Sequence, residues 1–220
     1  QAATQTGDNA ASAMKSVVAD PAAYDWQGDA PLRRPSAQTV IYEMHVGGFT
    51  RHPSSGIAEA KRGTYAGLIE KIPYLQDLGI TAVELLPVFH FDAQDCPAGR
   101  VNYWGYAPIS FFAPHPAYSS RQDALGPLDE FRDLVKALHR AGIEVVVNIM
   151  VGFPTETRAD FVETLRLLRR VRKSLHMVNN VGATAVVGGS RIHQSPDDYG
   201  VTPVDIRGWN DGDSFQWESE

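Results

Sequence analysis

The part of the sequence richest in side chains that could bind a ligand runs from residue 88 to residue 126. Nine aromatic or histidine residues and four prolines fall in it before Ala117. The prolines and the lack of periodicity predict a long, ordered loop rather than a helix or strand. Loops of this length inside a compact domain are usually functional, so we expect binding residues here.

Cysteine chemistry is almost excluded. Cys96 is the only cysteine, so this chain alone can build neither an intrachain disulfide nor a cysteine-ligated metal cluster. We therefore expect no metal site. A single cysteine also fits a reducing compartment, and we expect a cytoplasmic location.

The charge balance bears on the partners of the protein. A net charge of −6 argues against nucleic acid or an anionic membrane as a partner, because phosphate binding needs a basic face. The basic run at residues 166–173 is interrupted by apolar residues at helical spacing. We interpret it as the solvated face of an amphipathic helix rather than a binding patch. No apolar run approaches the length of about 20 residues that a membrane span needs.

Hydrophobic periodicity predicts strands that alternate with helices. Strands are expected at residues 39–46, 80–86, 143–150 and 177–187, and helices at 65–78, 127–141 and 159–175. Gly79 and Gly142 are expected to close the first two helices, and Glu130 lies near the positive end of the dipole of the second. In the third helix the apolar spacing places Phe161 and Leu165 on the inward face. Pro73 is tolerated only where a second helical segment or a kink begins. Alternating strands and helices indicate right-handed βαβ units and a parallel sheet. The predicted fold is α/β, a partial parallel β/α (TIM-like) barrel of about four βα units. An irregular leader at 1–37 precedes it, and an irregular tail follows from Gly188.

Several motifs in the first two thirds occur in an order typical of one family. They are VIYEMHV at 40–46 with GFT at 48–50, RGTYAGL at 62–68, LGITAVELLPV at 78–88, NYWGY at 102–106 and FAP at 112–114. In this respect the chain resembles the start of the catalytic barrel of glycogen-debranching and isoamylase-type glycoside hydrolases, in the α-amylase superfamily. The resemblance implies an α-1,6-branched glucan as partner. It also implies that Tyr103 is the aromatic platform for a sugar ring, with Trp104 beside it. A core role for both aromatics is the alternative.

Where the resemblance breaks down, the catalytic residues are missing. The next family motif, Asp-Val-Val-x-Asn-His, should fall on residues 148–153, where the chain has NIMVGF. Retaining glycosidases need two carboxyl groups about 5–5.5 Å apart. Glu43, Glu84 and Asp92 do not match the family's catalytic positions, and Glu84 is expected to be a structural acid. We therefore predict no catalytic residue in this chain. The resemblance also divides the chain into a leader at 1–37, a hydrolase-like segment at 38–147 and a second segment at 148–220.

The second segment is similar to the later part of a cobalamin-type radical S-adenosylmethionine domain. The sequence NIMVGFPTET at 148–157 carries this resemblance. It implies S-adenosylmethionine as cofactor, with Ile149, Gly152 and Pro154 near its adenosyl part. Cys96 alone cannot hold that family's iron–sulfur cluster, so the simpler interpretation is a strand-to-helix turn, and no cofactor is expected.

Three functions therefore stay open at the level of sequence. The first is a glycoside-hydrolase-like protein related to glycogen-debranching enzymes and inactive as this chain. The second is a radical enzyme fragment without its cluster cysteines, and the third is a non-catalytic or chimeric chain. A sheet of about four strands would also end in two edges, so we expect self-association through them or loose packing.

Overall fold

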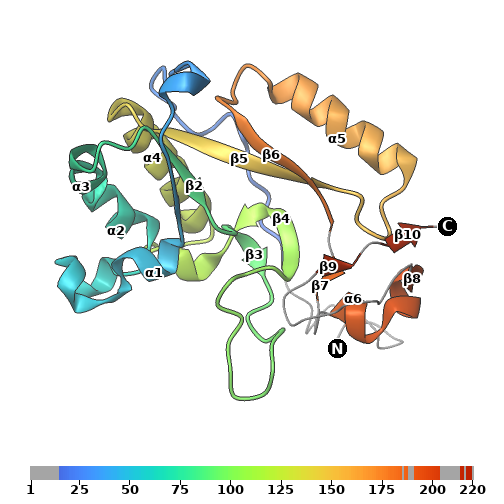
Figure 1. Cartoon of the computed structure of the whole chain (residues 1–220). Coiled ribbons are helices and arrows are strands. Elements are labelled where there is room, and N and C mark those ends of the chain that lie inside the picture. Colours follow the sequence, from blue (N-terminus) through green and yellow to red (C-terminus); the bar gives the residue numbers. More distant parts are fainter. Residues whose placement is uncertain (1–14, 185, 188–190, 204–213, 216, 220) are drawn as a thin grey trace. The chain divides into compact units, whose positions relative to one another are not determined.

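The computed structural model describes residues 15–184, 186–187, 191–203, 214–215 and 217–219. Its main sheet has the strand order β1-β2-β5-β6 (Figure 1). The strands are β1 Ile41–Met44, β2 Ala82–Leu85, β5 Glu144–Val151 and β6 Val178–Ala183. β5 pairs in parallel with β2 on one side and with β6 on the other. The carbonyls of Val40 and Met44 accept from the amides of Ala82 and Leu86, so β1 also runs parallel to β2. The predicted parallel strands are confirmed.

The helices predicted at 65–78, 127–141 and 159–175 are present with small shifts of their ends. The described helices are α1 Val46–Arg51, α2 Tyr65–Glu70, α3 Ile72–Asp77, α4 Gly126–Arg140, α5 Arg158–Val171 and α6 Arg191–Gln194. Short 3₁₀ turns lie at Ser36–Gln38, Pro53–Ser55, Glu59–Lys61, Pro116–Tyr118 and Pro196–Tyr199. The predicted helix at 65–78 divides before Pro73, which lies in the first turn of α3. Gly79 and Gly142 follow α3 and α4 with φ of 81° and 78°, values that favour glycine after a helix end. None of the described helices has the length and unbroken hydrophobicity that crossing a bilayer requires.

The region predicted as a long loop contains a strand pair. β3 Phe89–Phe91 pairs antiparallel with β4 Pro108–Pro114, with irregular register. The expectation of an irregular loop is therefore wrong for these two segments. Both strands contain two phenylalanines, and β4 tolerates its prolines because they stand at its two ends. What remains as loop is the segment between β3 and β4, which carries Tyr103 and Trp104.

The tail is also more regular than expected. β7 Val186–Val187 pairs with β9 Ser214–Phe215, and β8 Val201–Pro203 pairs with β10 Trp217–Ser219, both antiparallel. The prediction of an irregular tail is thus wrong for β8, β9, β10 and α6, whereas β7 lies inside the range predicted as a strand at 177–187. The runs are only two or three residues long, which is too short for a periodic pattern to stand out.

Helix α5 departs from its predicted packing. It runs along β5 and β6 (Figure 1), but none of its residues is buried, and Phe161 and Leu165 are 38% and 48% exposed. The prediction that Phe161 and Leu165 point inward is wrong. Apolar spacing predicts a face but cannot tell whether anything covers it, and α5 makes few contacts with other described elements. Its start is well defined by a capping box between Thr157 and Asp160.

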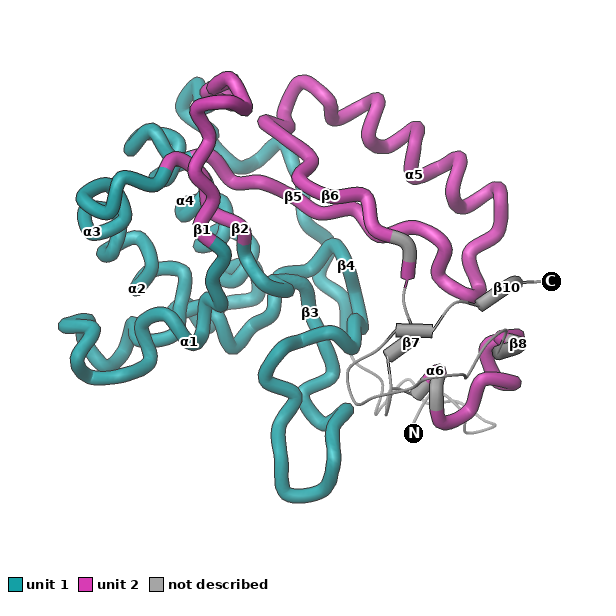
Figure 2. Tube along the Cα trace, in the orientation of Figure 1, with its two compact units in different colours: residues 1–29, 43–80, 85–143 teal, residues 30–42, 81–84, 144–220 magenta. Residues whose placement is uncertain are grey.

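Two compact units divide the chain (Figure 2). The first unit holds the described residues up to Asp29 together with Glu43–Ile80 and Leu85–Ile143. Its core is formed by side chains that are fully buried, namely Tyr65, Leu68, Leu75, Leu134 and Leu138. The second unit holds Ala30–Tyr42, Thr81–Glu84 and the chain from Glu144 onward, with Ala82, Val83 and Val146 buried.

Residues 24–29, part of the predicted leader, pack against α4 within the first unit, whereas residues 1–14 of that leader lie outside the described residues. The hydroxyl of Tyr24 donates to Asp133 at 2.5 Å, and the Lys136 ammonium lies 4.7 Å from the centre of the Tyr24 ring. Lys136 also donates to the carbonyl of Asp25, and Asp29 meets His139 at 2.8 Å. Burial alone would raise the pKa of Asp133, but hydrogen bonds from Tyr24 and Arg121 lower it. These contacts fix residues 24–29 on one helix.

Candidate functional site

The loop between β3 and β4 presents the two aromatic residues predicted to bind sugar. Tyr103 and Trp104 are 41% and 57% exposed, and their ring centres lie 5.4 Å apart in an edge-to-face arrangement. Neither is a core residue, which removes the alternative that they merely fill a loop interior. An exposed aromatic ring pair of this kind can cover the apolar C–H face of a sugar.

The loop that carries Tyr103 and Trp104 is shaped by Asn102 and Gly105 of the NYWGY motif. The side-chain oxygen of Asn102 accepts from the amide of Gly105 at 3.0 Å, and its amide nitrogen donates to the carbonyl of Asp92 at 3.1 Å. Gly105 has φ of 83°, and a Cβ there would lie 2.8 Å from the Phe91 ring. Asn and Gly are therefore needed for backbone shape at these two positions.

His45 forms the base of the cluster, which sequence reasoning did not identify. Its ring is stacked on Tyr103 with centres 4.2 Å apart and planes 8° apart. Its Nδ1 accepts from the amide of Gly48 at 2.9 Å, so in the neutral ring the proton lies on Nε2. Nε2 donates to the carbonyl of Tyr103 at 2.7 Å, with the Tyr118 hydroxyl 3.1 Å away. This histidine belongs to the VIYEMHV motif at 40–46, but only the fold brings it to Tyr103.

A second aromatic layer lies behind Tyr118. His115 is 8% exposed and is stacked on Phe91 with ring centres 3.9 Å apart. Burial, with His90 nearby, lowers the pKa of His115 to about 4, so its ring is neutral near neutral pH. Burial, with Tyr103 nearby, raises the pKa of Tyr118 to about 12. Both rings are therefore uncharged at neutral pH and support the cluster by packing.

The carboxylates of this region have structural partners. Glu130 in α4 accepts hydrogen bonds from Ser119, Ser120 and the amide of Ala66. Burial would raise its pKa, but these bonds lower it, so Glu130 is a fixed anion that clamps the 119–121 segment. Asp92 accepts from the amide of Gln94 at 2.8 Å.

Glu84 is a satisfied acid, as expected. In the second unit its two oxygens accept from Asn148 at 2.5 Å and from Asn179 at 2.8 Å. Asn148 stands where the hydrolase motif would have its Asp. Among the described residues no group of His, Cys, Asp and Glu side chains could hold a metal ion.

The residues assigned to a cofactor lie where β5 turns into α5. Ile149 is paired with Val181 of β6. Gly152 has φ of 70°, and its amide donates to Glu156, while Pro154 lies in the turn that follows. The observed contacts of these three residues are those of a strand-to-helix connection.

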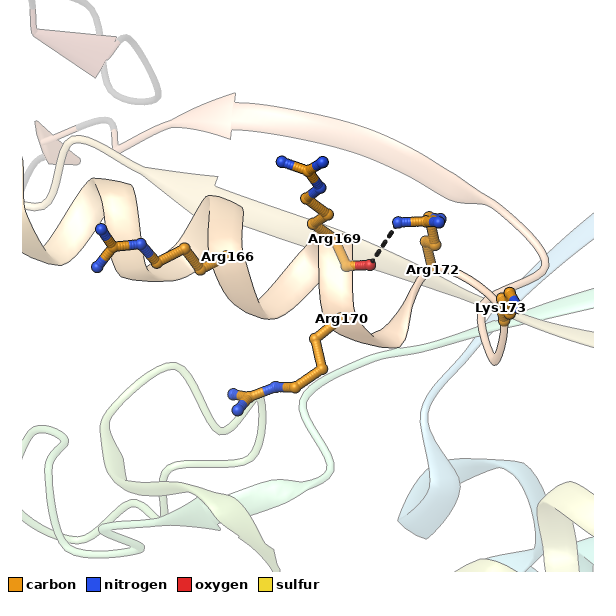
Figure 3. A pocket seen from close by; sticks show the side chains of 5 residues that line it. All are labelled: Arg166, Arg169, Arg170, Arg172 and Lys173. Atoms are coloured by element: carbon orange, nitrogen blue, oxygen red, sulfur yellow. Dashed lines mark hydrogen bonds between the residues drawn. The ribbon is translucent and has the colours of Figure 1, made fainter.

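The basic run of α5 lines an open hollow of about 510 Å³. Its lining residues are Arg166, Arg169, Arg170, Arg172 and Lys173. Figure 3 shows their side chains pointing in different directions, with Arg170 opposite Arg169 and Arg172. All five are exposed, and Arg166 is paired with Glu163. The helix dipole places partial negative charge at this end of α5, which suits cations and weakens anion binding. The exposed side chains agree with the predicted solvated face, and the absence of a binding partner there stays a prediction.

The comparisons with known proteins support the first resemblance. A family model described as "Alpha amylase, catalytic domain" matches residues 24–175. The glycogen debranching enzyme of Salmonella typhi is 49% identical over 158 residues, which cover 70% of this chain and 23% of that enzyme. The glycogen debranching enzyme of Salmonella schwarzengrund is 48% identical over the same length and the same shares.

A solved structure agrees with this fold. Pullulanase type I from Bacillus subtilis str. 168, complexed with maltose, is 32% identical with a TM-score of 0.50. The similarity covers 61% of this chain and 20% of that chain. The present chain thus spans about a quarter of the length of the curated relatives it matches. The family match continues past residue 147 through α5, and it gives no support to a radical S-adenosylmethionine segment or to a chimeric junction at 147.

Proposed function

Because the chain belongs to the α-amylase catalytic-domain family of glycoside hydrolases, we propose that its Tyr103–Trp104 loop binds an α-1,6-branched glucan. The observation that supports this most directly is the exposed Tyr103 ring, which is stacked on His45 and held in a shaped turn. A sugar needs a flat apolar ring in a fixed orientation, and a glucan offers repeated faces for it. The relatives whose names mention glycogen debranching support a branched substrate.

Catalysis is not expected of this chain by itself. The hydrolytic reaction needs a pair of carboxyl groups across the scissile bond, and the sequence at 148–153 lacks the family's Asp, Asn and His. Glu84, Glu130 and Asp92 are engaged in structural hydrogen bonds. Debranching activity is therefore proposed for a longer protein of this kind, and glucan binding for the present chain, in a cytoplasmic setting.

Two assays test the proposal. Titration calorimetry with maltohexaose should give saturable binding that Tyr103→Ala weakens at least about tenfold, the loss expected when a stacking ring is removed. Phe112→Ala, which removes an 84% exposed ring from β4, is the matched control and should bind as the parent does. A reducing-sugar assay with pullulan and glycogen should stay at the buffer blank. Equal binding by Tyr103→Ala and the parent would refute the assigned platform.

The radical S-adenosylmethionine alternative has one observation in its favour. The space beside Gly152 is open, because a Cβ there would meet no atom within 4 Å. Cys96 alone, however, cannot hold the iron–sulfur cluster on which the chemistry of this cofactor depends. We expect calorimetry with S-adenosylmethionine to show no binding, and saturable binding abolished by Gly152→Val would revive this function.

A further inference from the structure

We propose that His45 and Gly48 are positioning residues that clamp the Tyr103 ring, so that only one of its faces is open to a sugar. This inference rests on the proposed glucan binding and assigns the residues that orient the platform. His45 and Gly48 lie at the start of α1, more than 50 residues before Tyr103 in the chain. Three contacts link them to Tyr103.

The first part of the clamp is the covered face. The His45 ring lies parallel to the Tyr103 ring at 4.2 Å, so a sugar cannot stack on that side. The hydrogen bond from His45 Nε2 to the Tyr103 carbonyl ties the backbone of the same residue at 2.7 Å. A ring and its own backbone are thus both fixed by one imidazole. Tyr103 nevertheless stays 41% exposed, which leaves the opposite face for a ligand.

The second part of the clamp is the room made by Gly48. A Cβ on Gly48 would lie 2.2 Å from the hydroxyl oxygen of Tyr103, far closer than a non-bonded Cβ approaches another atom, so one of the two would have to shift. The next atom of the ring, Cζ, would be 3.5 Å away, which is ordinary contact. Gly48 has no positive φ that would itself demand glycine. Glycine at position 48 therefore leaves the space that the Tyr103 hydroxyl occupies.

The third part is the orientation of His45 itself. His45 is the N-cap of α1, and its Nδ1 accepts from the Gly48 amide. The same ring therefore performs two separable tasks, since Nδ1 caps the helix while the ring face and Nε2 hold Tyr103. Asparagine is a good N-cap but has neither an aromatic face nor a group at the position of Nε2. His45→Asn separates helix capping from platform positioning.

The His45 test measures stability and sugar binding in the same variant. His45→Asn retains the cap but loses the ring stack and the Nε2 hydrogen bond, so the thermal unfolding midpoint should fall by about 3–6 °C. Maltohexaose should bind about fivefold more weakly, as loss of an aromatic stack allows. In the unliganded parent, NMR should show upfield ring-current shifts of the His45 ring protons, which Tyr103→Ala removes. A purely structural role predicts unchanged maltohexaose binding in His45→Asn, and that result would overturn the proposal.

The Gly48 test uses rescue by a second substitution. Gly48→Ala should lower both the unfolding midpoint and maltohexaose affinity, because the added methyl group collides with the Tyr103 hydroxyl. Tyr103→Phe removes that oxygen, so Gly48→Ala combined with Tyr103→Phe should recover the midpoint and affinity of Tyr103→Phe alone. A double variant no better than Gly48→Ala would show that the clamp is wrong.

The two proposals can fail separately. If the parent chain does not bind maltohexaose, the proposed function fails, and the ring-current shifts and the midpoint rescue still decide whether the clamp exists. If the parent binds and the rescue is absent, glucan binding stands and the clamp falls.

Discussion

Replacing the buried His115 with phenylalanine should make the stability of this protein less sensitive to acid. The ring is stacked on Phe91 and is only 8% exposed. Its Nδ1 has no hydrogen-bond partner among the described residues, and the neighbouring ring of His90 lies 5.6 Å away. Phenylalanine keeps a flat ring for the stack and cannot take up a proton. The backbone bond from His115 to Val88 is unaffected by the change.

The size of the effect follows from the lowered pKa. Burial lowers the pKa of His115 to about 4, below an unfolded value of about 6.5. The unfolded chain therefore binds a proton more readily than the folded protein, and stability falls as pH drops below about 6.5. Between pH 8 and pH 5 the loss at this one group is about 2 kcal/mol, and at pH 4 it reaches about 3 kcal/mol.

Urea unfolding at pH 8, 7, 6 and 5 measures this loss. The pKa values of Glu130 and Asp133 are lowered, so their contributions to the stability of the protein also decrease as pH falls. The pH profile of the parent alone therefore cannot show how much of the loss is due to His115. The difference between parent and His115→Phe isolates it, and the gap should change by about 2 kcal/mol in favour of the variant from pH 8 to pH 5. His52→Phe, at an exposed histidine, is the control and should follow the parent. Parallel pH profiles for parent and His115→Phe, within about 0.5 kcal/mol, would refute the reasoning.

Three further results are expected. Leu138→Ala, at a fully buried position of α4, should lower the free energy of urea unfolding by about 3 kcal/mol, whereas a loss below about 1 kcal/mol would mean that the core of the first unit is not closely packed. Thr157→Ala should cost about 1 kcal/mol through the lost cap of α5, and Thr157→Ser should restore most of it in the same assay. Strand β6 lies at an edge of the sheet, and Val181 on it is 59% exposed, so size-exclusion chromatography should show self-association that Val181→Lys reduces; a sharp monomer peak for the parent at all concentrations would contradict this.

Sequence patterns predicted the parts of the fold that depend on local chemistry. Gly79 and Gly142 end helices where a left-handed residue is needed, and Pro73 starts α3, so each acts through its own backbone. The parallel order of the strands followed from such signals combined with the right-handed crossover rule.

What the sequence could not show depends on long-range neighbours. The apolar spacing of Phe161 and Leu165 indicates a helix face but not whether another element covers it. The His45 stack on Tyr103 joins residues 58 positions apart, and no periodicity relates them. Glu130 was expected to interact with the helix dipole, yet it closes the turn at Ser119 and Ser120, because burial makes every lone pair need a donor.

The contacts of residues 24–29 with α4 limit the order in which the chain can fold during synthesis. Tyr24 and Asp133 are 109 positions apart, and Asp29 and His139 are 110 apart. At a translation rate of about 5–20 residues per second, the leader leaves the ribosome roughly 5 to 20 seconds before its partner helix has been made. The leader must therefore wait without its native contacts, and its attachment is a late step. Residues 24–29 are thus synthesised before α4 but reach their native contacts only after it.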